Sequence, residues 1–550
     1  MFRSKQSSSS PHVKELEPQY LTGFPLAVLF VLICISAIQN TLEMTILATA
    51  IPSITTYFGT VQDVDWYGNA YLFTICVLQP LTGHIYRLFE IKRTLLVFLF
   101  LFALGTFVSA IGKSSTVFII GRAIAGIGCA GLFTGNMVII TAAAAPAIRP
   151  QLLSVSVAMV GIGGVVGPVL GGVITERLGW RWCLWIFLPS SGLLAISFML
   201  MHIPDAVQKG PARQTFLRLH HEIDLVGFSL FAPACVMFLL AISWGGSKFP
   251  WGSAVIIALL VAAFVSTLLS ISWICYRKER ALLPPHIMMK PVVLYGSIAT
   301  LLQGGVFLMM QFYLPLWFQS VKEASPEQGG IMMLPTCIAQ IVASICCAIL
   351  LKPVPYAPVW GVFGNLCAAV GAGLMTTFQP TTSAGKWIGY QIIVGIGRGF
   401  SMQIPLVAAQ STLLPSESSI AIAMLLFSQF FGGSIVNCIA KTIFINDLRP
   451  ALHQYVPSVD PQKVIDAGAT EIIKLVEPKD VQGIIVAYNR ALTVTFWLPT
   501  AAACLALLFT FGLGWHKVSV APPMKQNRDR DLRGMELEKN GTSCASSQVA

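Results

Sequence analysis

The sequence predicts an all-α integral membrane protein, because its composition and its hydropathy pattern both differ from those of a soluble chain. Of its 550 residues, 55% are hydrophobic and 11% are charged, and the mean hydropathy is +0.74. Soluble domains are about a quarter charged. An apolar run of roughly 18 or more residues is long enough to cross a bilayer as a helix. We expect fourteen such helices, near residues 24–52, 66–86, 94–112, 117–141, 152–174, 182–203, 224–244, 252–275, 291–320, 327–351, 358–378, 387–410, 420–445 and 491–515.

Basic residues outnumber acidic ones and give a formal net charge of +11, but they lie in short loops and tails. Membrane proteins concentrate lysine and arginine in this way on the cytoplasmic side, so we expect no nucleic-acid partner. The stretches RLFEIKR (87–93) and YRKER (276–280) therefore indicate cytoplasmic loops. An even number of spans then places both termini in the cytoplasm.

Polar segments divide the chain into halves. A polar linker covers residues 201–224, after six expected helices, and a polar tail covers residues 516–550. We expect the following parts: a cytoplasmic N-terminal tail (1–20), a six-helix half (21–203), a linker with two accessory helices (204–290), a second six-helix half (291–515) with an extracellular loop (446–490), and a cytoplasmic tail (516–550).

A short internal repeat supports two related halves. GRAIAGIGCAGLF (121–133) and GYQIIVGIGRGF (389–400) align at their GIG cores, which pairs Arg122 with Gln391. Many secondary transporters are built from repeated halves. The match is short, so it indicates this architecture only together with other features.

Several familiar patterns of enzymes and metalloproteins are missing or out of place. The thirteen cysteines lie in apolar segments without a CxxC pair, which predicts neither a disulfide framework nor a metal site. GIGCAG (126–131) fits the dinucleotide fingerprint but lies inside an expected span. No GxxxxGK[ST] occurs, so ATP-driven transport is not expected, and we expect no cofactor.

A glycine-rich segment, GIGGVVGPVLGG (161–172), combines six glycines with one proline. Such a helix carries almost no side chains on one face, and the proline favours a bend. Tight helix packing alone explains the pattern in one interpretation. In the other, the bent helix packs against the opposite half and closes a cavity.

Five stretches, in chain order, share their pattern with one family: LEMTILATAIP (42–52), WYGNAYLFTICVLQPLTGHIY (66–86), GRAIAGIGCAG (121–131), GVVGPVLGG (164–172) with WRW (180–182), and YLPLWFQ (313–319). Together they resemble the major facilitator superfamily, more narrowly its fourteen-helix drug:proton antiporters, which include fungal multidrug and toxin efflux carriers. Glu43 stands where this family usually has aspartate, and Arg122 matches its fourth-helix arginine. The antiporter motif maps onto Gly163, Gly167, Pro168, Gly171 and Gly172.

The resemblance implies the major facilitator fold, with helices arranged six, two and six and with inverted repeats. It implies a secondary active transporter rather than an enzyme, with proton-coupled efflux of small amphipathic drugs, toxins or secondary metabolites. Import or uniport of a nutrient or metal chelate is the alternative, and a non-transporting membrane sensor is less favoured. The loop after the second helix departs from the family pattern, because Arg87 occupies the position of its acid.

The same reasoning sets the expected partners and location. A small-molecule substrate, protons and the lipid bilayer are the expected partners, and we expect a monomer. We expect a multi-pass protein of the cell membrane, with a vacuolar or vesicle membrane as the alternative.

Glu43 is the only charged residue between Leu21 and Phe58. On a helix it lies on one side with Ser36, Gln39 and Asn40. Charge at this depth is costly and marks a functional candidate, and no other carboxylate falls in the middle of an expected span. Glu43 is therefore the candidate proton carrier, with a structural hydrogen bond to a neighbouring helix as the alternative.

Arg122 is the expected partner of Glu43, since both fall in the outer halves of spans that line the family's cavity. We hypothesise an ion pair that protonation or substrate loosens. A permanent structural ion pair is equally compatible with the sequence.

Arg398 lies two turns from Gln391 on the same helix face, near the middle of an expected span. Guanidinium groups bind anionic or carbonyl-rich partners, which favours a substrate of that kind. Backbone carbonyls could also satisfy this arginine.

Polar residues in the spans complete the expected substrate cavity. As interhelical hydrogen-bonding groups they have a structural explanation too. The candidates are Gln39, Asn40, Gln303, Gln311, Tyr313, Gln340, Gln391, Arg398 and Gln429.

Overall fold

The structure, a computed structural model, describes residues 20–518 apart from 48, 60–62, 206–208, 210–222, 247, 463 and 465–477. The described chain is helical, and no strand longer than an isolated bridge occurs in it. Thirteen of its helical segments are long and apolar enough to cross a membrane. The remaining expected span corresponds to α3 (Val64–Leu88), which is 25 residues long but less apolar. The expected count of fourteen spans is therefore not confirmed.

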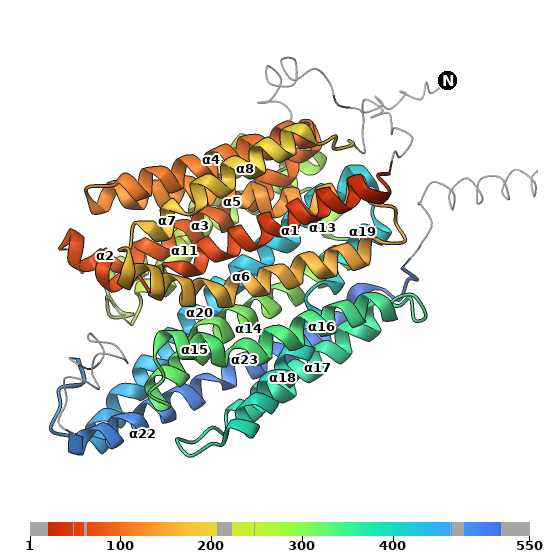
Figure 1. The fold of residues 1–550 in the computed structure, drawn as a ribbon. Helices are drawn as coiled ribbons and strands as arrows, with labels where there is room; N and C mark the ends of the chain where they lie inside the picture. The colour runs from red at the N-terminus through yellow and green to blue at the C-terminus, as the bar shows by residue number, and fades with distance from the viewer. Residues whose placement is uncertain are drawn as a thin grey trace, which may run out of the picture. The chain divides into compact units, whose positions relative to one another are not determined.

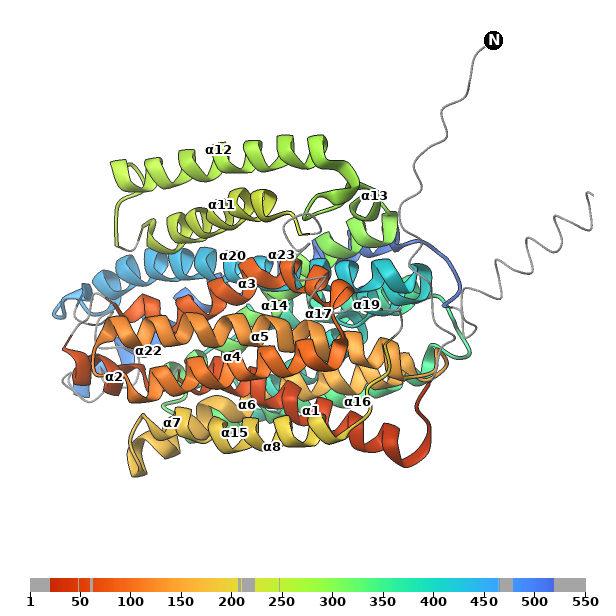
Figure 2. The same ribbon diagram turned by 90° about the horizontal axis from the view of Figure 1, so that it is seen from above.

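The chain packs as two compact units. The first unit comprises the described residues of 1–144, 166–288 and 415–430. Its helices, labelled in Figure 1 apart from α12, which is labelled in Figure 2, are α1 (Gly23–Ile46), α2 (Ile51–Phe58), α3, α4 (Ile91–Ile111), α5 (Ser115–Ala143), α7 (Trp182–Trp185), α8 (Phe187–Leu200), α11 (Leu225–Trp244), α12 (Ala254–Arg277) and α13 (Pro285–Met288), with the later part of α6 (Arg149–Arg177) and the start of α20 (Pro415–Tyr455).

The second unit comprises the described residues of 145–165, 289–414 and 431–550. It contains the first part of α6, the later part of α20, and α14 (Pro291–Val321), α15 (Pro326–Met332), α16 (Leu334–Leu350), α17 (Ala357–Met375), α18 (Ala384–Ser401), α19 (Ile404–Thr412), α22 (Pro478–Thr495) and α23 (Trp497–Thr510). The division into parts at residues 203 and 291 remains a proposal.

Glycines let helices α4 and α5 approach closely within the first unit, and Figure 2 shows the two helices side by side. A Cβ atom at Gly128 would collide with the backbone of Phe102, and one at Gly105 would collide with the backbone of Ala125. Only glycine permits such backbone contact. This packing holds α5, and with it Arg122, firmly against α4.

The same packing recurs in the second unit between α17 and α18. A Cβ atom at Gly397 would collide with the backbone of Ala368, and one at Gly371 would collide with the backbone of Val394. Gly397 is the residue that the GIG alignment pairs with Gly128. The short sequence repeat therefore corresponds to a repeated helix pair, one in each unit.

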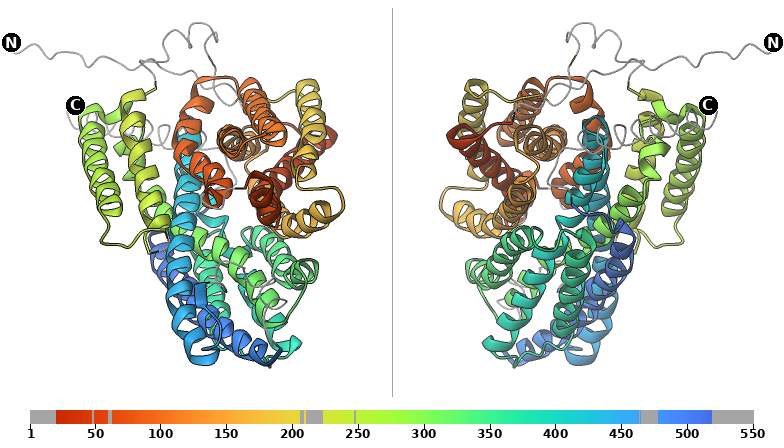
Figure 3. Two further views of the ribbon diagram at one scale, coloured as in Figure 1. Left: turned by 90° about the vertical axis from the view of Figure 1, so that its left-hand side faces the viewer. Right: turned by 90° about the vertical axis from the view of Figure 1, so that its right-hand side faces the viewer.

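The accessory helices α11 and α12 form a neighbouring pair in the first unit (Figures 2 and 3). Asp224 joins their ends, because its carboxylate accepts hydrogen bonds from Gly227 N (2.9 Å), Trp273 Nε1 (2.8 Å) and Leu282 N (3.1 Å). A carboxylate at a helix N-terminus also interacts favourably with the helix dipole. The carbonyl of Leu282 in turn lies 2.7 Å from His84 Nε2 of α3. Asp224 is thus a structural carboxylate.

The connection between α3 and α4 is held by residues that follow α8. Lys209 Nζ donates to the carbonyl oxygens of Tyr86 (2.8 Å) and Arg87 (2.6 Å). Asp205 Oδ1 accepts from the backbone N–H of Ile91 (3.1 Å). Burial lowers the pKa of Lys209 to about 8, because it disfavours the charged ammonium group. Lys209 and Asp205 therefore fix this connection through its main-chain groups, and Arg87, expected in the loop, lies in the last turn of α3.

Candidate functional site

The polar stripe of α1 is buried inside the first unit. Ser36, Gln39, Asn40 and Glu43 are each less than 5% exposed. Gln39 bonds to α8, donating to Ser191 Oγ (2.8 Å) and accepting from Ser190 Oγ (2.9 Å). The side-chain amide of Asn40 has no hydrogen-bond partner in the described chain. The stripe therefore faces other helices, as its periodicity predicts.

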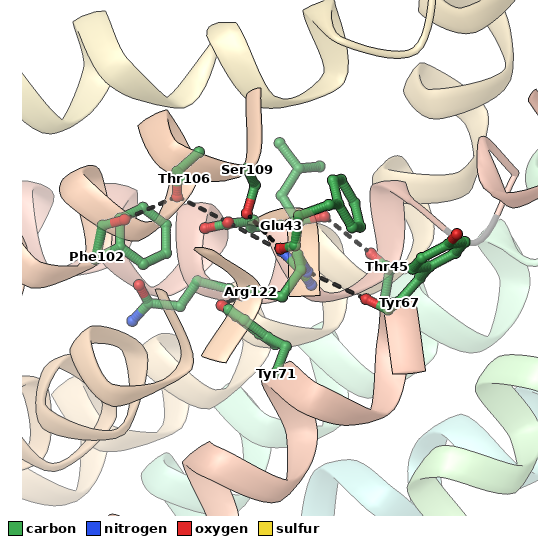
Figure 4. Close-up of polar contacts among 11 residues, drawn as sticks. Glu43, Thr45, Tyr67, Tyr71, Phe102, Thr106, Ser109 and Arg122 are labelled. Carbon is green, nitrogen blue, oxygen red and sulfur yellow. Dashed lines mark hydrogen bonds and ion pairs between the residues drawn. The ribbon is translucent and has the colours of Figure 1, made fainter. Parts of the chain in front are cut away.

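Glu43 and Arg122 meet in a buried ion pair (Figure 4). Arg122 Nη1 lies 3.1 Å from Glu43 Oε1, and both side chains are at most 1% exposed. Oε1 also accepts a hydrogen bond from Thr106 Oγ1 of α4 (2.8 Å). The other carboxylate oxygen, Oε2, is buried and has no partner. The pair expected from the sequence thus exists in the structure, with one oxygen left unsatisfied.

Arg122 has further contacts that do not depend on Glu43. Its Nε donates to the carbonyl oxygen of Tyr67 (3.3 Å). Its guanidinium carbon lies 4.2 Å from the ring centroid of Tyr71, a cation–π contact. Both tyrosines belong to α3, and Figure 4 shows them on the side of Arg122 away from Thr106. These contacts join Arg122 to α3 independently of the carboxylate of Glu43.

Thr106 has one hydroxyl proton and two acceptors. Besides Glu43, the carbonyl oxygen of Phe102 lies 2.8 Å from its Oγ1. When Glu43 is charged, the hydroxyl can donate to it. When Glu43 is protonated at Oε2, Oε1 becomes a weaker acceptor and the hydroxyl can donate to Phe102 instead. Thr106 can thus serve both protonation states without a change of rotamer.

Glu43 and Asp224 are the only buried carboxylates in the part of the chain that the structure describes. All three of the hydrogen bonds that Asp224 accepts fasten the accessory helices, whereas Glu43 keeps an oxygen without a partner. The two buried acids therefore have different environments, and that of Glu43 can accept a proton.

The glycine-rich segment of α6 lies against the end of α1 that carries Glu43. A Cβ atom at Gly167 would collide with Thr45, and one at Gly171 would collide with the carbonyl oxygen of Ile46. Thr49 Oγ1 also donates to the carbonyl oxygen of Pro168 (3.3 Å). Gly172 belongs to the same unit, whereas Gly163 falls in the second unit. The antiporter-like glycines thus contact the residues immediately after Glu43.

In the second unit, Gln391 repeats the contacts of Arg122. Gln391 Nε2 donates to the carbonyl oxygen of Met332 (2.9 Å), as Arg122 Nε donates to Tyr67. Gln391 Oε1 accepts from Thr336 Oγ1 (2.8 Å), while Arg122 lies over the ring of Tyr71. The repeat therefore extends to side chains, with a neutral amide in place of the arginine.

The other expected cavity residues are distributed over both units. Gln303 Nε2 donates to Asn365 Oδ1 (3.2 Å), and the ring of Tyr313 packs edge-on against Phe444. Gln429 is half-buried and belongs to the first unit. Gln311, Gln340 and Arg398 lie in the second unit and are considered below. Whether the candidates from both units line one cavity remains a proposal.

Thr106, Tyr67 and Tyr71 are the site residues that sequence reasoning missed. Thr106 lies in an apolar helix without a polar stripe, so nothing in its surroundings marks it. Tyr67 contributes a carbonyl group, which carries no residue-type signal. Tyr71 lies inside a stretch that resembles the family's second helix, and that is the one available indication.

Comparison with known proteins agrees with this architecture. Residues 33–437 match the family model of the Major Facilitator Superfamily. "Efflux pump mlcE" of Penicillium citrinum is 36% identical over 528 residues, covering 94% of this chain and 95% of that protein. "MFS-type efflux pump MFS1" of Trichophyton rubrum is 37% identical over 500 residues, with 91% and 93% covered. The site and the fold thus define a membrane transporter rather than an enzyme. The chain belongs to the Major Facilitator Superfamily.

Solved structures show the same fold at low sequence identity. The proton:xylose symporter XylE, bound to 6-bromo-6-deoxy-D-glucose, has a TM-score of 0.58 at 13% identity, covering 90% of this chain and 97% of that one. The human organic anion transporter MFSD10 has a TM-score of 0.54 at 13% identity, covering 88% and 100%. At this identity the likeness concerns the fold alone.

Proposed function

We propose that the protein exports small amphipathic organic compounds, such as drugs, toxins or secondary metabolites, in exchange for protons. The observation that carries the proposal is the buried Glu43–Arg122 pair with its unsatisfied oxygen. The names of the relatives, which describe efflux pumps and MFS-type transporters, support the direction of transport. The glycine contacts around the end of α1 support an antiport mechanism, because the same motif marks antiporters in this family.

The proton binds at Glu43 Oε2, the oxygen without a partner. Protonation removes the negative charge and with it most of the attraction to Arg122. Arg122 keeps its bond to the Tyr67 carbonyl and its contact with the Tyr71 ring, so the cation remains partly satisfied on α3. Oε1 of the neutral acid is then a carbonyl oxygen and a weaker acceptor, so the Thr106 hydroxyl can donate to Phe102 instead. Protonation thus uncouples α1 from α5.

Uncoupling α1 frees the segment on which the α6 glycines rest. Thr45 and Ile46 follow Glu43 directly and contact Gly167 and Gly171. A shift at Glu43 is therefore transmitted to α6 by backbone contact. Substrate binding at polar residues such as Gln39 and Asn40 acts on the same helix. Proton and substrate then compete through the position of α1.

A hydroxyl group at position 106 is required for this exchange. Thr106→Val keeps the side-chain shape and removes the hydrogen bond. Bonds to charged groups contribute about 1.5–3 kcal/mol, so we expect proton-driven transport to slow by about tenfold or more. Thr106→Ser keeps the hydroxyl and should transport at nearly the rate of the wild type. Equal rates for the valine and serine variants, measured in proteoliposomes, would remove Thr106 from the mechanism.

Export itself is tested in cells that overexpress the protein. Loaded with a fluorescent amphipathic dye such as rhodamine 6G, they should retain less dye than cells with an empty vector. A protonophore should abolish the difference, because it collapses the driving force. Greater dye accumulation in the overexpressing cells would favour an importer or uniporter instead. We further propose cytoplasmic termini, a monomer, and residence in the cell membrane rather than a vacuolar or vesicle membrane.

A further inference from the structure

Arg398 is a buried cation of the second unit without a counterion. Its side chain is 5% exposed, and in the described chain it forms neither an ion pair nor a hydrogen bond to a backbone carbonyl. The guanidinium group makes a cation–π contact with the ring of Phe307, whose centroid lies 4.7 Å from the guanidinium carbon. Buried charges are normally paired, because leaving water is costly for an ion. A permanent structural role would require partners that Arg398 does not have.

Residues of four helices, α6, α14, α16 and α18, surround Arg398 or contact its neighbours. Arg398 of α18 lies beside Cys337 of α16, and the Cys337 thiol donates to the carbonyl oxygen of Gly161 in α6 (3.6 Å). A Cβ atom at Gly161 would lie 3.3 Å from Gln340 Nε2 of α16. The ring of Phe307, on α14, packs against the guanidinium group. Gly161 of α6 thus adjoins the polar side chains of Cys337 and Gln340 on α16.

Gln340 adds a second unsatisfied group to this arrangement. It is 1% exposed, and neither its amide nitrogen nor its amide oxygen has a partner in the described chain. Gln311, one helical turn from Phe307, lies against Gly164, one turn from Gly161. Unsatisfied buried polar groups are rare, and Arg398 and Gln340 are both linked to the Cys337–Gly161 contact, which indicates a missing partner.

We propose that Arg398 and Gln340 bind an acidic group of the substrate, a carboxylate in particular. A guanidinium donates two parallel hydrogen bonds to a carboxylate, and the amide of Gln340 can donate a third. In the structure's second unit no buried carboxylate is described that could compete for Arg398. The ring of Phe307 provides an aromatic surface next to the charge. The substrate class is therefore amphipathic organic acids.

The inference rests on the proposed transport of organic compounds but not on proton coupling. Its test is the binding of 2-naphthoate and of 2-naphthamide, which have the same rings and differ in charge. Binding to the purified full-length protein in detergent is measured by isothermal titration calorimetry. We expect the acid to bind about tenfold tighter or more, the effect of a charge-assisted bond. Arg398→Gln should weaken binding of the acid more than binding of the amide and so reduce the preference to about onefold, and Arg398→Lys should retain part of the preference.

Thermal unfolding distinguishes a binding role from a structural one. Because Arg398 has no partner, Arg398→Gln should melt at the same temperature as the wild type or higher. The matched control is Lys441→Gln, which removes a cation from α20 instead and should preserve the acid preference. Equal binding of acid and amide by the wild type, no heat from naphthoate at about 1 mM, or a preference that survives Arg398→Gln would overturn the inference. An acid preference that depends on Arg398 in a protein without proton-coupled efflux would leave the inference standing and refute the proposed coupling.

Discussion

Replacing Glu43 by glutamine is expected to abolish transport driven by a pH gradient while the protein still folds and reaches the membrane. Glutamine has nearly the shape of the protonated acid, so the variant imitates one of the two states that the proposed cycle visits. It cannot release a proton, and the cycle stops there. Arg122 keeps its bond to Tyr67 and its contact with Tyr71 in that state. Uptake of dye into proteoliposomes with an imposed pH gradient should fall to the level of protein-free vesicles.

Two further variants serve as a control and as a partial rescue. Glu90→Gln makes the same chemical change at an exposed carboxylate that pairs with Arg93, and transport should not change. Glu43→Asp restores a titratable group and the residue usual in the resembled family, and coupling should partly return. A permanent structural ion pair predicts otherwise. Removing one partner of a buried ion pair costs about 3–5 kcal/mol of stability. If the pair were structural, Glu43→Gln and Arg122→Gln would therefore both lower the melting temperature by similar amounts.

Valine in place of Gly171 is expected to produce the second large loss of transport. A Cβ atom there would collide with the carbonyl oxygen of Ile46, and backbone cannot move aside as the end of a side chain can. Overpacking of this kind typically costs about 1–3 kcal/mol, and here it would push α6 away from the end of α1 that follows Glu43. The transport rate in proteoliposomes should fall to near background, with a lowered melting temperature.

Gly192→Val is the matched control for this prediction. Gly192 lies on α8, and a Cβ atom there would meet nothing within 4 Å. The same substitution should therefore leave both transport and the melting temperature nearly unchanged. Similar transport rates for the two valine variants would refute the role of the α6 glycines.

The sequence was sufficient to predict the ion pair but not its surroundings. The polar stripe and the cost of a buried charge identified Glu43, and the resemblance supplied Arg122. The two lie 79 positions apart, and helix periodicity cannot bring them together. Thr106 could not be predicted, because its role follows from the close approach of α4 and α5 at their glycines. The carbonyl of Tyr67 could not be predicted either, because every residue type has a main-chain carbonyl.

In the second unit, too, the sequence predicted a candidate residue but not its contacts. The sequence identified Arg398 and left backbone satisfaction open as its explanation. Only the structure reveals the absence of such bonds in the described chain and the unsatisfied amide of Gln340 nearby. The GIG alignment correctly paired Arg122 with Gln391, and the structure extends this pairing to the carbonyls of Tyr67 and Met332. The expected count of fourteen spans was not confirmed, because the polar residues of α3 keep it out of the thirteen helical segments that are apolar enough to cross a membrane.

The central claim is that Glu43 holds the transported proton, and substrate-induced proton release tests it most directly. A transported substrate is added to the purified protein in weakly buffered detergent solution, and a pH-sensitive dye reports the protons released. The wild type should release up to about one proton per molecule near the pH at which Glu43 is half protonated, and Glu43→Gln should release none. Equal proton release by the variant, with unchanged substrate affinity, would contradict the account.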